Sequence, residues 1–175
     1  MARQSTIKSI TNSPDAVRQI YTFEIFIVDG PITRKFAKKN KVISRTIQIR
    51  GEQTLATLHD AIFDAFDREE EHMYEFQIGG EGPMDPKARR YGLPEDKNDL
   101  SSDNLTGDVE RTTIGSLGLT TDDVFGYWFD FGDDWWHQIN VEAIEEKVER
   151  GKLPRVTKRI GQSPPQYVDW DEEDE

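Results

Sequence analysis

The chain contains no cysteine among its 175 residues. Without cysteine it has neither a disulfide scaffold nor a zinc site with thiolate ligands. Long apolar runs are also missing, and the run Ile25–Val28 is far too short to cross a membrane. No apolar segment follows the first residues, so we see no signal peptide and expect a cytoplasmic protein without a membrane partner.

The usual catalytic motifs are absent as well. Residues 115–118 read Gly-Ser-Leu-Gly, whereas a nucleophile elbow needs Gly-x-Ser-x-Gly. No glycine-rich loop with a lysine is present to cradle a phosphate. A pair of His137 with Asp130 or Asp133 would suit a general base, but the sequence offers no partner nucleophile. We therefore expect a binding protein rather than an enzyme.

The charge is negative and unevenly distributed. The chain has 22 Lys and Arg residues against 34 Asp and Glu residues, giving a net charge of −12. An acidic protein repels phosphate backbones, so we do not expect nucleic-acid binding in general. A basic cluster is the local exception, and it is interpreted as a solvated loop: Arg34, Lys35, Lys38, Lys39, Lys41 and Arg45.

The first half of the chain predicts a hairpin followed by a helix. Residues 20–28 are rich in β-branched and aromatic types, and residues 42–49 alternate between apolar and polar, so both are expected to be strands. Thr54 is a plausible N-cap of a helix whose apolar stripe is Leu55, Leu58, Ile62 and Phe66. His59 falls inside this stripe and is predicted to face the core.

The second half predicts more strands around a long insertion. We expect a strand at 72–78, an insertion at 79–110, a brief helical turn near Ile114, and strands at 124–131 and 135–142. The prediction is an α+β fold with a β-grasp-like mixed sheet (ββαβ…ββ) and one main helix packed on it. Residues 20–167 form the predicted single domain, between a polar lead-in at 1–19 and an acidic tail at 168–175.

The hairpin formed by 124–131 and 135–142 carries the main candidate binding surface. A three-residue loop, Gly132–Asp134, collects the apolar residues on one side and places Phe131 opposite Trp135. Trp128, Asp130 and Trp136 then lie on the other face, where tryptophan is typical of interaction surfaces. The alternative is that the insertion or the C-terminal segment covers this face. The candidate binding residues are Trp128, Asp130, Asp133, Trp136 and His137.

The three histidines of the chain suggest a second possibility. His59, His72 and His137 could meet with Asp130 or Asp133 around a divalent metal, because histidine and carboxylate ligands suit zinc, manganese or iron. No spacing here is specific for a metal, and buried histidines are more often structural. No cofactor is therefore expected, and a divalent metal at His59, His72 and His137 remains the alternative.

Three segments together resemble one known family. Residues 54–62 include the leucine-histidine helix, His72–Phe76 reads His-x-x-x-Phe, and residues 127–137 read Tyr-Trp-Phe-Asp-Phe-Gly-Asp-Asp-Trp-Trp-His. This combination resembles the Ri-plasmid open-reading-frame-three-like family from about residue 20 to 167, including its Pro-Pro element at 164–165.

The chain departs from the family pattern in places. Phe129 stands where the family usually has tyrosine, and Trp136 precedes His137. The segment around the Pro-Pro element lacks the acidic and cysteine residues often found there. The resemblance implies a fold rather than an activity. Some members carry a transposon-resolvase-like label, but a serine resolvase would need a basic DNA-binding domain and this chain is acidic.

The sequence thus favours a small non-catalytic module that binds a protein or peptide through the aromatic hairpin face. The first alternative is a metal-binding protein or metal-dependent enzyme. The last is a mobile-element-associated nucleic-acid accessory protein that would use the basic loop at 34–45.

Overall fold

The computed structural model describes residues 18–93 and 105–171. The first half holds β1 (Arg18–Asp29), α2 (Arg34–Lys39), β2 (Ser44–Arg50), α3 (Leu55–Ala65) and β3 (Tyr74–Ile78). The second half holds β4 (Arg89–Gly92), β5 (Gly107–Asp108), the 3₁₀ turn η3 (Ile114–Leu117), β6 (Val124–Phe129), β7 (Trp135–Lys147) and β8 (Arg155–Ile160). Most of the predicted lead-in and parts of the predicted insertion and acidic tail lie outside the described residues.

The strands form one eight-stranded sheet in the order β5-β4-β3-β6-β7-β1-β2-β8. All neighbours are antiparallel except β4 and β5, which form a parallel pair at one edge. The mixed sheet and the α+β class are confirmed. The more specific β-grasp-like arrangement is not confirmed, because β1 and β7 at the centre of the sheet run antiparallel.

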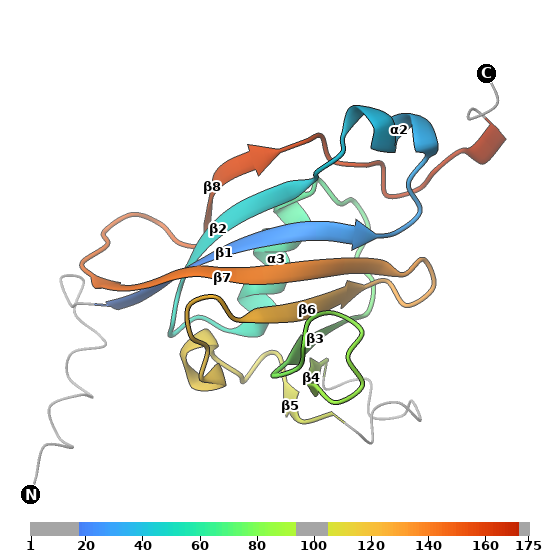
Figure 1. The fold of residues 1–175 in the computed structure, drawn as a ribbon. Helices are drawn as coiled ribbons and strands as arrows, with labels where there is room; N and C mark the ends of the chain where they lie inside the picture. The colour runs from blue at the N-terminus through green and yellow to red at the C-terminus, as the bar shows by residue number, and fades with distance from the viewer. Residues whose placement is uncertain (1–17, 94–104, 172–175) are drawn as a thin grey trace, which may run out of the picture.

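The helix α3 lies across one face of this sheet, behind it in the view of Figure 1. Thr54 caps it as predicted, since its side chain accepts a hydrogen bond from the Thr57 amide. The predicted stripe packs inward against the sheet, with Leu55, Leu58 and Phe66 fully buried. We call the face under α3 the inner face and the opposite one the outer face.

Three strands were not predicted, for physical reasons. The edge strand β8 is polar, and most of its side chains are exposed, so it carries little apolar periodicity. The predicted insertion contributes β4 and β5 to the other edge, and four- and two-residue strands are too short for a pattern. The predicted loop at 34–45 contains the short helix α2, which Thr33 caps.

The interpretation of Arg45 as part of a solvated basic loop is wrong. Arg45 lies on β2 with its side chain on the inner face and is 2% exposed. Its guanidinium donates to the carbonyls of Ala65, Ser44, Ile160 and Gly161 and to the Ser163 hydroxyl. It therefore joins β2, the end of α3 and the segment after β8, because a planar five-donor group can satisfy several carbonyls at once.

Candidate functional site

The turn between β6 and β7 is longer than predicted. Phe129 pairs with Trp135 and Tyr127 pairs with His137, so five residues, 130–134, form the loop instead of three. Asp130 closes this loop: its Oδ1 accepts from the amides of Gly132 and Asp133, and its carbonyl accepts from the Asp134 amide at 2.7 Å. Asp130 and Asp134 both have positive φ, which aspartate tolerates better than most residues.

This register differs from the predicted one by two residues, so each side chain of β6 and β7 keeps its predicted face. Asp130 and Phe131 are the exceptions, because both were predicted in the strand and lie in the loop instead. Phe131 was expected on the inner face opposite Trp135, but it packs against Trp128, with 4.1 Å between ring centroids and the planes 32° apart. The burial of apolar side chains could not distinguish the three-residue loop from the five-residue loop. The five-residue loop is closed by hydrogen bonds to the Asp130 side chain and not by apolar contact.

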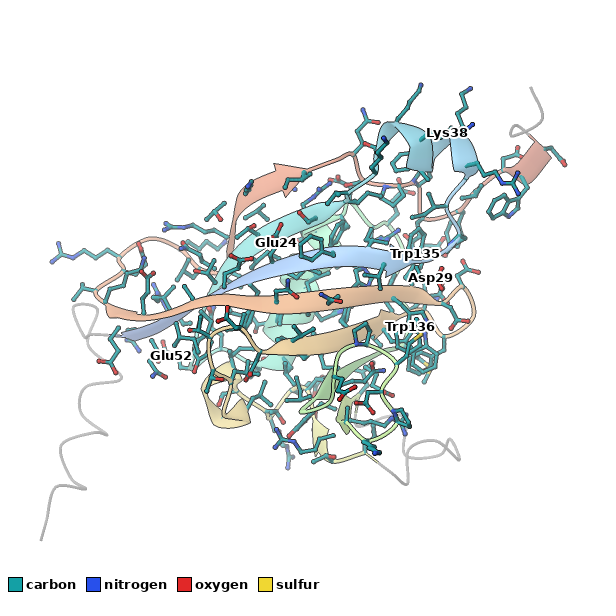
Figure 2. All side chains as sticks on the ribbon, viewed as in Figure 1. Glu24, Asp29, Lys38, Glu52, Trp135 and Trp136 are labelled. Carbon is teal, nitrogen blue, oxygen red and sulfur yellow. The ribbon has the colours of Figure 1, made fainter. Side chains whose placement is uncertain are left out.

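Three aromatic rings pack together on the outer face at the hairpin end of the sheet. Trp128 and Trp136 face each other across β6 and β7 with ring centroids 4.8 Å apart and planes 5° from parallel. Phe131 covers the other side of Trp128, and the Trp128 indole N–H donates to Asp134 Oδ1 at 2.9 Å. Both tryptophans are half-buried. We call Trp128, Phe131 and Trp136 the aromatic platform; Figure 2 labels Trp136.

The predicted insertion covers the neighbouring part of this face. A Cβ added to Gly126 on β6 would lie 2.7 Å from the Cα of Pro83 and 2.5 Å from Oε1 of Gln77. The loop between β3 and β4 therefore packs directly on β6, in front of the sheet in Figure 1. Next to it, Arg90 forms an ion pair at 2.6 Å with the buried Glu75, the residue opposite Trp128 in the sheet. The platform lies beside this covered region.

Two of the candidate binding residues are buried away from the outer face. His137 lies on the inner face at 1% exposure, where its Nδ1–H donates to the Tyr127 carbonyl at 3.3 Å. Burial and the nearby Arg68 guanidinium lower the pKa of His137 to about 3. Asp130 is also buried, and its Oδ1 closes the turn. Asp133 is exposed at the tip of the loop.

His59 is buried as predicted and joins three elements. Its Nε2 faces the Glu71 carboxylate at 2.9 Å, its Nδ1 faces the Tyr127 hydroxyl at 2.6 Å, and its ring stacks on Tyr74 with centroids 3.6 Å apart. Because a carboxylate only accepts, Nε2 carries the proton and the Tyr127 hydroxyl donates to Nδ1. Burial lowers the pKa of His59, although Glu71 acts in the opposite direction. Burial also raises the pKa of Tyr127 well above its usual value, so this hydroxyl is a poor nucleophile.

His72 has a different environment, near the surface. The Tyr167 hydroxyl donates to Glu70 at 2.7 Å, so the Nε2–H of His72 donates to the Tyr167 oxygen, also at 2.7 Å. The same nitrogen lies 3.5 Å from Asp130 Oδ2. The three histidines thus lie in three separate environments. His59 contacts the Tyr127 hydroxyl, His137 contacts the Tyr127 carbonyl, and His72 contacts the C-terminal segment.

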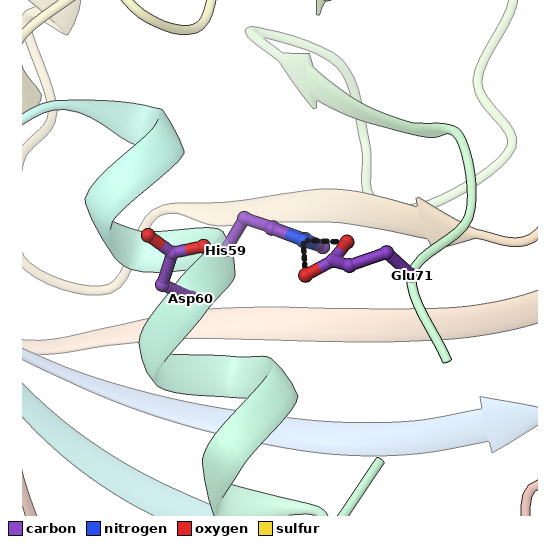
Figure 3. A group of neighbouring side chains, drawn as sticks. All are labelled: His59, Asp60 and Glu71. Atoms are coloured by element: carbon purple, nitrogen blue, oxygen red, sulfur yellow. Dashed lines mark hydrogen bonds and ion pairs between the residues drawn. The ribbon is translucent and has the colours of Figure 1, made fainter. Parts of the chain in front are cut away.

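Among residues 18–93 and 105–171, one group of three side chains has the composition of a metal site. Ligand atoms of His59, Asp60 and Glu71 lie within 4.8 Å of one another. Figure 3 shows the Glu71 carboxylate facing the His59 ring, with Asp60 beside His59 on α3. The Glu71 side chain is 59% exposed, so solvent reaches one side of the group. The set offers one imidazole and two carboxylates, a combination that suits zinc or manganese.

A buried cation was not anticipated from the sequence. The guanidinium of Arg68 lies 3.9 Å from the centre of the Trp135 ring, and the residue is 8% exposed. Burial lowers the pKa of Arg68 to about 10, while Tyr127 and Asp130 act in the opposite direction. Its Nη1 and Nη2 have no hydrogen-bond partner within the described residues. Cation–π attraction to Trp135 compensates part of the lost hydration.

The chain was compared with known families and structures. The sequence model of the plasmid pRiA4b ORF-3-like proteins matches residues 32–170. The chain belongs to this family. The resemblance inferred from the three segments is therefore confirmed.

Relatives of this ORF-3-like protein give no function. The uncharacterised protein y4hQ of Sinorhizobium fredii is 25% identical over 130 residues, 73% of this chain. The chain spans 59% of the length of y4hQ. A crystal structure of a protein of unknown function, MM3350 from Methanosarcina mazei, is similar with a TM-score of 0.64 and 24% identity, over 85% of this chain and 73% of that one. That likeness shows the fold alone. No helix within the described residues is long and apolar enough to cross a bilayer.

Sequence reasoning missed several residues of these sites. Glu71 had no signal of its own, since it stands in a short acidic run just before the predicted strand. Asp60 had no signal either: it is exposed on α3, and only the position of Glu71 in space brings the two together. Phe131 was assigned to the wrong face because the loop length was wrong.

Proposed function

We propose that this ORF-3-like protein is a non-catalytic binding module that holds a protein or peptide on the aromatic platform. One observation carries the proposal: Trp128 is fixed between two rings while its N–H is already satisfied by Asp134. A surface that is rigid before binding loses little side-chain entropy on binding. Tryptophan is also enriched among the residues that contribute most to binding.

The neighbouring chemistry supports binding rather than catalysis. His59, Tyr127 and His137 are almost completely buried and hydrogen-bond to protein groups. A general base or nucleophile must reach the atom it attacks, and the polar atoms of these groups are already bonded to Glu71, to one another and to the Tyr127 carbonyl. We therefore assign them to holding α3 against β6 and β7. Asp133, exposed at the loop tip, is a charged residue in a position to contact a bound partner.

Selection from a displayed peptide library tests the proposal. Random dodecapeptides are selected on the wild-type protein, and the affinities of the selected peptides are then measured for Trp136→Ala by isothermal titration calorimetry. We expect Trp136→Ala to weaken binding by about tenfold or more, as for a typical hot-spot residue. Trp170→Ala is the matched control, because Trp170 is 52% exposed and lies outside the platform.

Equal affinity of the selected peptides for the wild type and Trp136→Ala would contradict the proposal. A library that yields no specific binder would do the same. If Trp136→Ala fails to fold, Gln138→Lys replaces it. Gln138 is half-buried on the same face of β7, two residues from Trp136, and bonds only to Asn140. A lysine there obstructs the platform without touching the inner core.

A second candidate function is divalent-metal binding, favoured by the group formed by His59, Asp60 and Glu71. A metal held at Nε2 of His59 would require the ring proton to lie on Nδ1 instead, where it would be donated to the Tyr127 oxygen, and the Tyr127 hydroxyl would turn its own proton away from the ring. Such an outer hydrogen bond commonly orients a histidine ligand. The candidate does not include His72 or His137, since both lie outside this group.

Thermal unfolding with and without ZnCl₂ tests the second candidate. A ligand that binds only the folded state raises the melting temperature, and the rise should disappear in Glu71→Gln. Glu69→Gln is the control, because it removes an exposed carboxylate of the same loop outside the group. An unchanged melting temperature in the wild type, or the same rise in both variants, would refute metal binding at His59.

A further inference from the structure

A groove lies between α2 and the C-terminal segment, outside the aromatic platform. It has a volume of about 310 Å³ and is mostly apolar. Phe36 and the residues before α2 form one wall, and residues 164–169 form the other. The main apolar contributors are Pro31, Ile32, Phe36, Pro164, Pro165 and Val168. Lys35 lies at the rim on one side and Asp169 on the other.

Both walls are held in place by specific contacts. Phe36 packs against the core, and Thr33 caps α2 by accepting from the Phe36 amide. On the opposite wall, the buried Gln166 accepts from the amides of Glu69 and Glu70 and donates to the Glu70 carbonyl. The groove is therefore a preformed feature that does not depend on a bound molecule for its shape.

The charge around the groove is opposite to that of the rest of the chain. Residues 34–45 contain six basic residues and no acidic one, while residues 51–175 carry a net charge of −19. Lys35, Lys38 and Lys39 are exposed on α2, and Figure 2 shows Lys38 projecting away from the molecule. None of these three lysines forms an ion pair with a described residue. Asp169 at the far rim accepts from the Asp171 amide.

We infer that this groove binds an acidic peptide that inserts an apolar side chain between Phe36 and Pro164. Acidic residues of the peptide lie along Lys35, Lys38 and Lys39. The acidic remainder of the protein repels such a peptide, so α2 is where it can approach. The proline and aromatic walls supply the apolar contact, and the lysines supply orientation and association rate. This inference is independent of the function proposed for the aromatic platform.

A peptide fits these features better than a nucleic acid does. Phe36 is half-buried against the core, so it is not a fully exposed ring of the kind on which a base stacks. Among the described residues that line the groove Lys35 is the one cation, and most of the lining is apolar, which suits an apolar side chain better than a phosphate backbone. Asp169 at the rim and the nearby Glu70 would also oppose a continuous polyanion.

Fluorescence anisotropy with designed peptides tests the inference. The probe is a fluorescein-labelled nonapeptide with a Leu-Phe-Leu centre and three glutamates on each side. Two matched peptides replace either the centre by serines or the glutamates by lysines. We expect the probe to bind about tenfold more tightly than either matched peptide, because charge and apolar contact are both required. Affinity should also fall as salt is added.

Variants of the full chain test separately whether the lysine charge and the open apolar groove are needed for binding of the probe. Lys35→Glu should weaken binding of the probe about fivefold or more, whereas Lys152→Glu should leave it unchanged. Lys152 is an exposed lysine in the loop before β8, at the opposite end of that strand from the groove. Val168→Arg adds positive charge but fills the groove, so it should weaken binding if the apolar side chain enters there.

Several results would overturn the inference. These are equal binding of the three peptides, tighter binding to Val168→Arg, or equal effects of Lys35→Glu and Lys152→Glu. A single-stranded DNA oligonucleotide of equal charge is also tested as a competitor. If it displaces the probe at a lower concentration than the unlabelled peptide does, α2 binds nucleic acid instead. Trp136→Ala should bind the probe normally, which keeps this test separate from that of the aromatic platform.

Discussion

His137 should make the stability of the protein depend on pH below neutrality. Its ring is buried on the inner face, and burial and Arg68 lower its pKa to about 3 from 6.5 in the unfolded chain. Between these two values the unfolded chain binds a proton that the folded protein does not. The stability that comes from keeping His137 neutral is therefore complete above pH 6.5 and is lost as the pH falls toward 3.

The size of this loss of stability follows from the difference between the folded and unfolded pKa values of His137. One pKa unit corresponds to about 1.4 kcal/mol, so moving from pH 7 to pH 5 should lower the free energy of unfolding by about 2 kcal/mol through His137 alone. Burial also lowers the pKa of His59, which adds a loss of the same sign. Carboxylates titrate mainly below this window, so the histidines dominate the pH dependence between pH 7 and 5.

Urea denaturation at pH 7 and pH 5 measures the effect. The variant His137→Asn removes the titrating ring and keeps an N–H near the position of Nδ1, so it should lose about 2 kcal/mol less than the wild type between the two pH values. Ile139→Val is the control: it lies on the same strand, lowers stability and removes no titrating group. Equal pH dependence of the wild type and His137→Asn would refute the reasoning.

Three further predictions follow from the fold. Gly126→Ala should cost about 1–3 kcal/mol of stability, because the new Cβ overlaps Pro83. Gly132→Ala is the control and should be close to neutral in the same urea assay, because its Cβ would meet only Asp130, at 3.4 Å. Arg45→Met should cost about 3 kcal/mol, because it removes the guanidinium donor to the carbonyls of Ile160 and Gly161, and Arg45→Lys should not restore this. Rapid amide exchange after β8 in both variants would support the role of Arg45, and wild-type stability would contradict it. Thr54→Ala should lower stability by about 1 kcal/mol through loss of the helix cap, and Thr54→Ser should recover most of it in thermal unfolding.

Much of the inner face could be predicted from the sequence. The strands at 20–28 and 124–131 and the helix after Thr54 have strong periodic patterns, and the core position of His59 followed from its angle on that helix. The edges of the sheet could not be predicted, because β4, β5 and β8 are short or polar. The alternation of apolar and polar residues along a strand reflects which side chains are buried, and edge strands bury few side chains.

The candidate sites were harder to predict than the fold. The two tryptophans of the platform could be placed on one face because parity alone decides the face of a strand residue. The closure of the loop by Asp130 could not be predicted, because it depends on a side-chain hydrogen bond and the pattern of apolar residues carries no sign of it. The group of His59, Asp60 and Glu71, and the groove beside α2, join residues from separate segments, and only the folded chain shows their proximity.

The most direct test of the proposed function is an NMR titration of the indole N–H signals. The chain has four tryptophans, and single Trp→Phe variants assign their signals. When a peptide selected on the wild type is added, the signals of Trp128 and Trp136 should shift together, while those of the buried Trp135 and the exposed Trp170 stay in place. A titration that moves the Trp170 signal and leaves Trp128 and Trp136 unchanged would contradict binding at the aromatic platform.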